Sequence, residues 1–224
     1  MAAVIAVFDF DGTLVSTSVW PTLVRAQWRR RLNRLPLVLH LMAHYPLYPA
    51  VRIGILPEER FRRLWAEHMP WLLWRMAVPQ AEQLFGEVAR ELLDALRPGV
   101  AERLRWHQSQ GHLVVLLSAA FEPLLRAFAA LLGLEHVVGS PLEVRDCRYT
   151  GRVSPPICMG ENKVRRLQQY LGHLGISVDW GQSHAYADSY TDEAVLRLVG
   201  HPIAVCPDQR LAEVARISGW TIMQ

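Results

Sequence analysis

The stretch VIAVFDFDGTLVST, residues 4–17, decides how this sequence is interpreted. It begins as an apolar run rich in β-branched residues and without alternation, which predicts a short strand covered on both faces. Two carboxylates, Asp9 and Asp11, follow the run directly, and Gly12 and Thr13 come next. Because Gly12 has no Cβ, the backbone there can turn sharply and approach a ligand closely. We therefore expect the strand to end in a chemical site.

Beyond this stretch the chain divides by pattern into a helical segment and an alternating segment. Between about residues 16 and 96, apolar residues recur three and four positions apart, which predicts helices. Pro98-Gly99 then interrupts the pattern. After it, strand-like and helix-like runs alternate up to residue 223, with a hairpin expected over 142–153. Alternation at this spacing predicts a parallel sheet covered on both faces by helices.

The predicted fold class is therefore α/β, with a Rossmann-like three-layer parallel sheet core and an inserted all-helical cap. The core comprises residues 1–15 and 97–224, and the cap comprises residues 16–96, inserted after the first strand over the carboxyl edge of the sheet. Strands are expected over 3–8, 112–118, 136–140, 183–189, 202–207 and 220–223, and core helices over 121–133, 161–175, 191–200 and 208–219.

The three cysteines are scattered and show no metal-ligand spacing, which favours a reducing compartment. No secretion signal precedes the first strand, so a cytoplasmic location is expected. Residues 20–75 carry ten arginines against three glutamates, an excess that suits either an anionic partner or a solvated helical face. No recognition motif accompanies these arginines, so we expect no nucleic-acid partner.

Residues 35–51, LPLVLHLMAHYPLYPAV, are apolar for a surface lobe but are interrupted by histidines and prolines. The stretch is too short and broken for an ordinary transmembrane helix. The favoured interpretation is the core of the cap. The alternative is a surface that rests on a membrane or receives an apolar ligand, since arginines flank the stretch. Membrane association and peripheral membrane contact through the cap therefore stay open.

Polar groups fall where the predicted parallel strands end, the edge at which α/β proteins bind ligands. Asp9, Asp188 and Asp192 would concentrate negative charge there, which is costly unless a cation neutralises it. Oxygen ligands alone suit a hard cation, and Mg²⁺ is commonly held by one or two carboxylates, waters and phosphate oxygens. Such a metal could neutralise an incoming phosphate and leave one carboxylate free to attack phosphorus.

Lys163 is the single lysine of the chain, against twenty-three arginines, and it opens a predicted helix. An ammonium is a compact point charge, whereas a guanidinium is a broad fork, so the two are not equivalent at a tight site. Lys163 suits the oxygens of a phosphoryl group, and the hydroxyl of Ser118, at the end of the second predicted strand, can donate to them.

Taken in the order in which they occur along the chain, these candidate site residues resemble the four motifs of the haloacid dehalogenase (HAD) superfamily. DFDGTLV is similar to its first motif, Ser118 in LLSAA to the second, Lys163 to the third, and ADSYTDE, in the DxxxD form, to the fourth. The set spans the chain from Asp9 to Asp192. The helical insertion between the first and second motifs resembles the C1 cap of the phosphoserine phosphatase-like (IB) branch.

The resemblance implies a role for each matching residue. Asp9 would attack phosphorus, and Asp11 would protonate the leaving oxygen and later deprotonate water. Mg²⁺ would be bound by Asp9, Asp188 and the backbone carbonyl of Asp11, with Asp192 orienting the metal shell. Ser118, Ala119 and Lys163 would hold the phosphoryl group.

One departure bears on the substrate. Ser18 stands where phosphoserine phosphatases carry a glutamate for the substrate's ammonium group, which weakens the case for phosphoserine. The predicted function is a Mg²⁺-dependent phosphomonoester hydrolase acting on a small phosphorylated metabolite or a lipid phosphate. The alternative is a non-catalytic phosphate-binding or membrane-docking module on the same fold.

Overall fold

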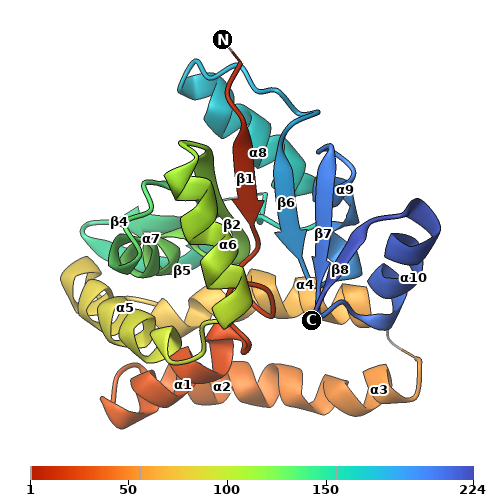
Figure 1. Cartoon of the computed structure of the whole chain (residues 1–224). Helices are drawn as coiled ribbons and strands as arrows, with labels where there is room; N and C mark the ends of the chain where they lie inside the picture. The colour runs from red at the N-terminus through yellow and green to blue at the C-terminus, as the bar shows by residue number, and fades with distance from the viewer. Residues whose placement is uncertain (1, 56, 155) are drawn as a thin grey trace.

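The computed structural model describes residues 2–55, 57–154 and 156–224. Six strands form one parallel sheet in the order β3-β2-β1-β6-β7-β8. Their bounds are β1 Ile5–Phe8, β2 Leu113–Phe121, β3 His136–Ser140, β6 His184–Ala187, β7 His201–Val205 and β8 Thr221–Met223. The strand arrows in Figure 1 run towards the layer that contains helices α1 to α4. The predicted Rossmann-like sheet is thus confirmed.

Successive side chains of β1 enter two different cores, one on each face of the sheet. Ala6 and Phe8 pack into the core shared with α6 (Pro98–Ser109) and α7 (Glu122–Leu131). Ile5 and Val7 pack into the core shared with α8 (Glu161–His173), α9 (Glu193–Leu196) and α10 (Gln209–Ser218). Burying a large apolar side chain fully contributes about 1.5–3 kcal/mol, so the uninterrupted apolar run of β1 holds both layers to the sheet.

Helix α6 was not predicted, because Pro98-Gly99 was interpreted as an interruption. In the structure Pro98 is the first residue of α6. Proline is favourable there, because its missing N–H would have no partner in the first turn and its φ is already helical. The helix expected over 191–200 is shorter than predicted, since it consists of a 3₁₀ turn, Tyr190–Asp192, and α9.

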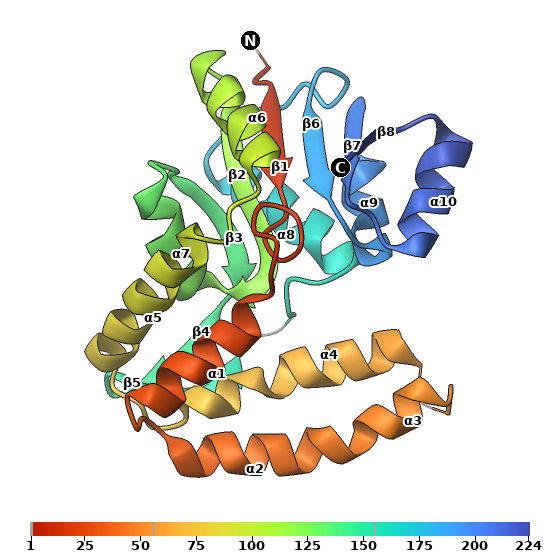
Figure 2. The ribbon, with the colours of Figure 1, turned by 60° about the horizontal axis from the view of Figure 1, so that its bottom comes forward.

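Between β1 and β2 the chain forms the helical insert, and Figure 2 shows α1 to α4 beyond the carboxyl ends of the strands. Its elements are α1 Val19–Arg29, α2 Arg34–His44, α3 Tyr48–Arg52, α4 Glu58–His68 and α5 Val78–Leu93, with 3₁₀ turns at Tyr45–Leu47 and Met69–Leu73. Leu23, Leu72 and Phe85 of this segment belong to the same core cluster as Phe8 of the sheet. The insert is therefore packed continuously onto one face of the core.

The predicted hairpin is present as β4 (Leu142–Arg145) and β5 (Arg148–Val153). It lies against the helical insert, which was not anticipated. The N–H of Arg75 donates to the carbonyl of Tyr149 over 2.8 Å, and the N–H of Val78 donates to that of Cys147 over 3.0 Å. These bonds tie the insert to a segment that follows β3.

The apolar stretch 35–51 has two faces. Leu37, His40 and His44 of α2 point into the insert and are buried. Leu35, Leu39 and Met42 of the same helix are 67%, 54% and 69% exposed. The favoured interpretation as cap core is thus wrong for the outer face of α2. Within the described residues, no helix combines the length and the apolar character that crossing a bilayer requires.

Candidate active site

The candidate site lies where the strand order of the sheet reverses. β2 and β3 lie on one side of β1, and β6 to β8 lie on the other. Asp9 follows β1 and Asp188 follows the adjacent β6, and the N–H of Asp9 donates to the carbonyl of Tyr186 over 2.9 Å. Ligand sites of open α/β sheets form at such a reversal. The structure therefore brings together the aspartates that the sequence separates by 179 positions.

The turn after β1 depends on Gly12. This residue has φ +80°, a conformation that L side chains rarely adopt. A Cβ at this position would lie 2.1 Å from Oδ2 of Asp188, so only glycine leaves room for that carboxylate. Thr13, for which no role was predicted, donates a hydrogen bond from its hydroxyl to Oδ1 of Asp188 over 3.0 Å. Both residues fix the orientation of Asp188.

Asp9, Asp188 and Asp192 form a carboxylate cluster in which one oxygen from each residue lies within 4.8 Å of the others. Burial, together with the negative charge of Asp9, raises the pKa of Asp188 to about 7. The cluster is therefore costly to ionise fully unless a cation neutralises it. Its all-oxygen donor set, and the space that Gly12 leaves beside Asp188, suit a hard cation. The cluster can accordingly bind a metal ion.

Lys163 lies in the first turn of α8 and is 4% exposed. Its Nζ is 2.6 Å from Oδ1 of Asp9 and 2.5 Å from Oδ1 of Asp192. Burial alone would lower the pKa of Lys163, but the charges of Asp192 and Asp9 outweigh it and raise the pKa above its ordinary value. The ammonium therefore stays charged, and Asp192, which was expected to orient a metal shell, also positions the lysine.

Asp11 occupies a different environment from Asp9. Its Oδ1 accepts a hydrogen bond of 2.7 Å from the N–H of Val19, the first residue of α1. Burial raises the pKa of Asp11 to about 7, with the charges of Asp9 and Asp188 adding to the effect and the Val19 N–H opposing it. A group that titrates near neutral pH can both give and take a proton there.

Ser118 and Ala119 lie within β2, which continues to Phe121 instead of ending at Ser118 as predicted. The pairing register of β2 shifts between Leu117 and Phe121, so regular pairing still stops where the serine was expected to end the strand. Ser118 is buried, and its Oγ accepts a bond of 3.1 Å from the N–H of Ala120. Both residues open onto the same cavity as the aspartates.

A cavity of about 820 Å³ unites the predicted residues. Its lining includes Asp9, Asp11, Ser118, Ala119, Lys163, Asp188 and Asp192. The insert adds an aromatic wall, which we define as Trp20, Tyr45, Tyr48, Phe61 and Trp65. This wall was not predicted, because residues that line a cavity recur with the same helical spacing as residues that fill a core.

Comparison with known proteins places the chain among phosphatases. The model of the haloacid dehalogenase-like hydrolase family matches residues 6–197. The chain is 27% identical to a histidinol-phosphatase of Neisseria meningitidis, over 98% of this chain and 97% of that protein. It is 32% identical to the phosphoserine phosphatase SerB1 of Mycobacterium tuberculosis, over 97% of this chain and 69% of that protein. The chain also resembles a protein of unknown function from Bordetella pertussis whose crystal structure is known. The two sequences are 26% identical, and the structures match with a TM-score of 0.83 over 100% of this chain and 99% of that chain.

Proposed function

The chain belongs to the haloacid dehalogenase-like hydrolase family, and on that premise we propose that it is a Mg²⁺-dependent phosphomonoester hydrolase whose substrate carries an apolar group. The predicted resemblance to HAD-type phosphatases of the phosphoserine phosphatase-like branch is confirmed. The observation that carries the proposal is the ion pair of Lys163 with Asp9, because Asp9 also belongs to a carboxylate cluster that can hold a metal ion.

In the proposed reaction Asp9 is the nucleophile. Lys163 holds one carboxylate oxygen of Asp9, and the other attacks phosphorus while the bond to the leaving oxygen breaks. Mg²⁺, held by Asp9, Asp188 and the carbonyl of Asp11, would neutralise the charge of the phosphoryl group. Ser118, the backbone at Ala119 and Lys163 would bind the phosphoryl oxygens.

Asp11 is the proposed general acid and base. In its protonated form it gives its proton to the leaving oxygen as the aspartyl-phosphate forms. The resulting carboxylate then takes a proton from water, which attacks phosphorus and releases phosphate from Asp9. A pKa near 7 suits both steps, because neither protonation state is then costly at neutral pH. Its bond to Val19 N–H also links this residue to α1 of the insert.

The cavity favours an apolar leaving group. Its acidic residues, Asp9, Asp11, Asp188 and Asp192, all belong to the phosphate end, and the wall contributed by the insert is aromatic. Ser18, which lines the same cavity, places no negative charge opposite a substrate ammonium group. We propose that residues 16–96 act as a cap that selects the substrate through this wall, and that phosphoserine is a poor substrate.

We favour a lipid phosphate over a small polar metabolite as the substrate. Tyr45 and Tyr48 line the cavity and are also 73% and 52% exposed, so the aromatic wall continues onto the surface. The same stretch of the insert exposes further apolar side chains, which we call the apolar face: Leu35, Leu39, Met42, Ile53 and Ile55. Arginines flank it in sequence, and exposed apolar side chains next to basic ones favour an anionic membrane. We accordingly propose a cytoplasmic enzyme that rests on membranes through this face.

A substrate screen tests the activity. Initial rates are measured with and without Mg²⁺ on phosphoserine, histidinol phosphate and alkyl or lysophospholipid phosphates of increasing chain length. We expect Mg²⁺-dependent turnover that rises with chain length and is abolished in Asp9→Asn. Turnover that Asp9→Asn retains would reject the nucleophile, and binding of phosphate esters without turnover would favour a non-catalytic module. A preference for phosphoserine would reject the apolar substrate.

Membrane contact is tested separately, by sedimentation with vesicles of neutral or anionic lipid. Leu39→Glu and Met42→Glu place charge on exposed positions, so folding and turnover of a soluble short-chain phosphate should persist. We expect wild type to bind anionic vesicles and both variants to lose binding. As a matched control, Ile217→Glu changes an exposed apolar residue of α10, outside the insert, and should leave binding intact. Equal binding of all four proteins would reject the apolar face as the contact.

A further inference from the structure

Four of the nine histidines gather at the opposite edge of the sheet from the aspartates. His107 lies near the end of α6, His112 directly precedes β2, and His184 and His201 are the first residues of β6 and β7. His184 and Asp188 are four residues apart along one strand, which corresponds to about 13 Å. The histidines are thus a separate cluster from the carboxylates.

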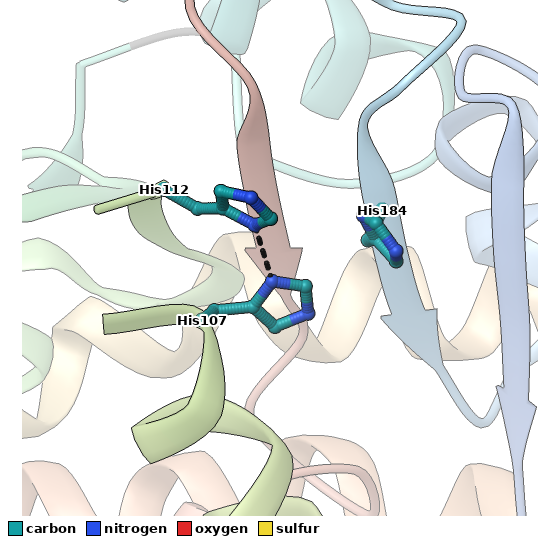
Figure 3. Close-up of side chains that lie close together, drawn as sticks. All are labelled: His107, His112 and His184. Atoms are coloured by element: carbon teal, nitrogen blue, oxygen red, sulfur yellow. Dashed lines mark hydrogen bonds between the residues drawn. The ribbon is translucent and has the colours of Figure 1, made fainter. Parts of the chain in front are cut away.

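Three of these imidazoles converge. One ring nitrogen each of His107, His112 and His184 lies within 4.8 Å of the others. Nδ1 of His107 is 2.8 Å from Nδ1 of His112, and Figure 3 shows these two rings meeting edge to edge with His184 opposite them. Zinc–nitrogen bonds of about 2.0–2.1 Å in a tetrahedron place ligand nitrogens about 3.4 Å apart. The closest pair must therefore separate slightly to share one ion.

The surroundings of the rings resemble the support that metal-bound histidines need. Nε2 of His107 lies 3.0 Å from the hydroxyl of Tyr186, which can accept a hydrogen bond from an Nε2–H and so leave Nδ1 for an ion. Such a partner on the other ring nitrogen is typical of metal-ligating histidines. Nδ1 of His184 is buried and meets no described residue in full hydrogen-bond geometry, although the backbone of Gln182 lies close to the ring. Burial lowers the pKa of His107 to about 3 and that of His184 to about 4, so both rings are neutral at neutral pH.

We propose that His107, His112 and His184 form a binding site for a divalent transition-metal ion of the Zn²⁺ type, distinct from the carboxylate cluster. Imidazole ligands suit Zn²⁺, Co²⁺ and Cu²⁺, whereas Mg²⁺ prefers oxygen. Three imidazoles leave a fourth position of a tetrahedral ion for water or another ligand. Because the ligands come from α6, the start of β2 and the start of β6, the bound ion would cross-link three elements at this edge.

One neighbour opposes the site. The positive charge of Arg103 lies close enough to contribute to the lowered pKa values of His107 and His184. A cation bound between these rings would feel the same repulsion. The site is therefore expected to be weaker than it would be with a neutral residue at this position, and Arg103→Gln should tighten metal binding severalfold.

Cobalt titration of the metal-free full chain tests the proposal, because tetrahedral Co²⁺ absorbs visible light and Zn²⁺ displaces it silently. The variants His112→Ala and His184→Asn each remove one proposed ligand. Both rings are half-buried, and each variant tests the site without changing the other ligand. His173→Ala, at the exposed end of α8, is the matched control. Asp188→Asn removes a carboxylate of the other cluster, so cobalt absorption that persists in this variant cannot depend on Asp188.

We expect one tetrahedral Co²⁺ per chain, counted by its visible absorption, in wild type, His173→Ala and Asp188→Asn, and we expect this absorption to be lost on adding Zn²⁺. Affinity should fall more than about tenfold in His112→Ala and His184→Asn, since losing even a supporting partner of a ligand costs that much. Absence of cobalt absorption in wild type would overturn the proposal. So would unchanged affinity in both histidine variants, or loss of binding confined to Asp188→Asn.

Discussion

Replacing Asp188 by asparagine should stabilise the metal-free protein. In the folded state burial and the charge of Asp9 hold the pKa of Asp188 at about 7, against an ordinary value of 3.8. Between these two pH values the folded chain binds a proton that the unfolded chain has lost, so the free energy of unfolding falls as pH rises. Asparagine does not titrate, so the variant does not lose stability in this way as pH rises. Its side-chain oxygen can still accept the hydrogen bond from the Thr13 hydroxyl, and its NH₂ group can face the cavity.

The size of the effect follows from the pKa. At about 1.4 kcal/mol per pH unit, the difference between 3.8 and about 7 corresponds to roughly 4 kcal/mol for an isolated group. Asp188 shares its charge repulsion with Asp9, so we expect roughly 2–4 kcal/mol above pH 7. For a chain of 224 residues this raises Tm on the order of 5–10 °C.

The assay is thermal unfolding in chelator, from about pH 4 to about pH 8, followed by addition of Mg²⁺. The Tm difference between Asp188→Asn and wild type should be near zero at the acid end and grow towards pH 8. Mg²⁺ should then raise the Tm of wild type alone. A variant that is less stable than wild type near pH 8 without metal, or a Tm difference independent of pH, would refute the electrostatic reasoning.

Three further substitutions test other parts of the site. Asp11→Asn should lower kcat by a factor of about 10²–10⁴. In wild type the rate should fall above pH 7 because Asp11 loses the proton that it gives to the leaving oxygen, and a pH–rate profile of the variant should lack this fall. Gly12→Ala should cost more stability in thermal unfolding than Gly133→Ala, which has a similar positive φ and open space around it, and should weaken Mg²⁺ activation. Lys163→Met should abolish turnover and destabilise the metal-free protein by about 3–5 kcal/mol, measured by denaturant unfolding. Lys163→Arg keeps the positive charge and should therefore lose less stability.

The gathering of the candidate site residues around one cavity could be predicted, because the sequence signals are local. An apolar run followed by Asp9 and another followed by Asp188 each indicate a strand end by themselves, whereas Ser118 marks only the point where the regular pairing of β2 stops. Their meeting at one edge then follows from a parallel sheet. The strand order that makes β1 and β6 neighbours was not predictable, since it depends on pairings such as Phe8 with Tyr186 between distant segments.

The features that were missed depend on tertiary contacts. Trp65 lines the cavity and Leu37 fills a core, yet both recur at the helical spacing that predicted the insert. Met42 faces outward because α2 lies at the surface of the insert, and its sequence does not distinguish this from burial. The histidine cluster comes from separate elements, and no spacing in the sequence joins His107 to His184.

Trapping the covalent intermediate shows whether Asp9 is the nucleophile. Wild type mixed with a phosphomonoester and Mg²⁺ is quenched in acid, and acyl phosphate is reduced with borohydride before peptide mass analysis. Our account predicts homoserine in place of the aspartate at position 9, and none in Asp9→Asn. Rapid turnover with an unmodified Asp9, or reduction of Asp11 or Asp188 instead, would contradict it.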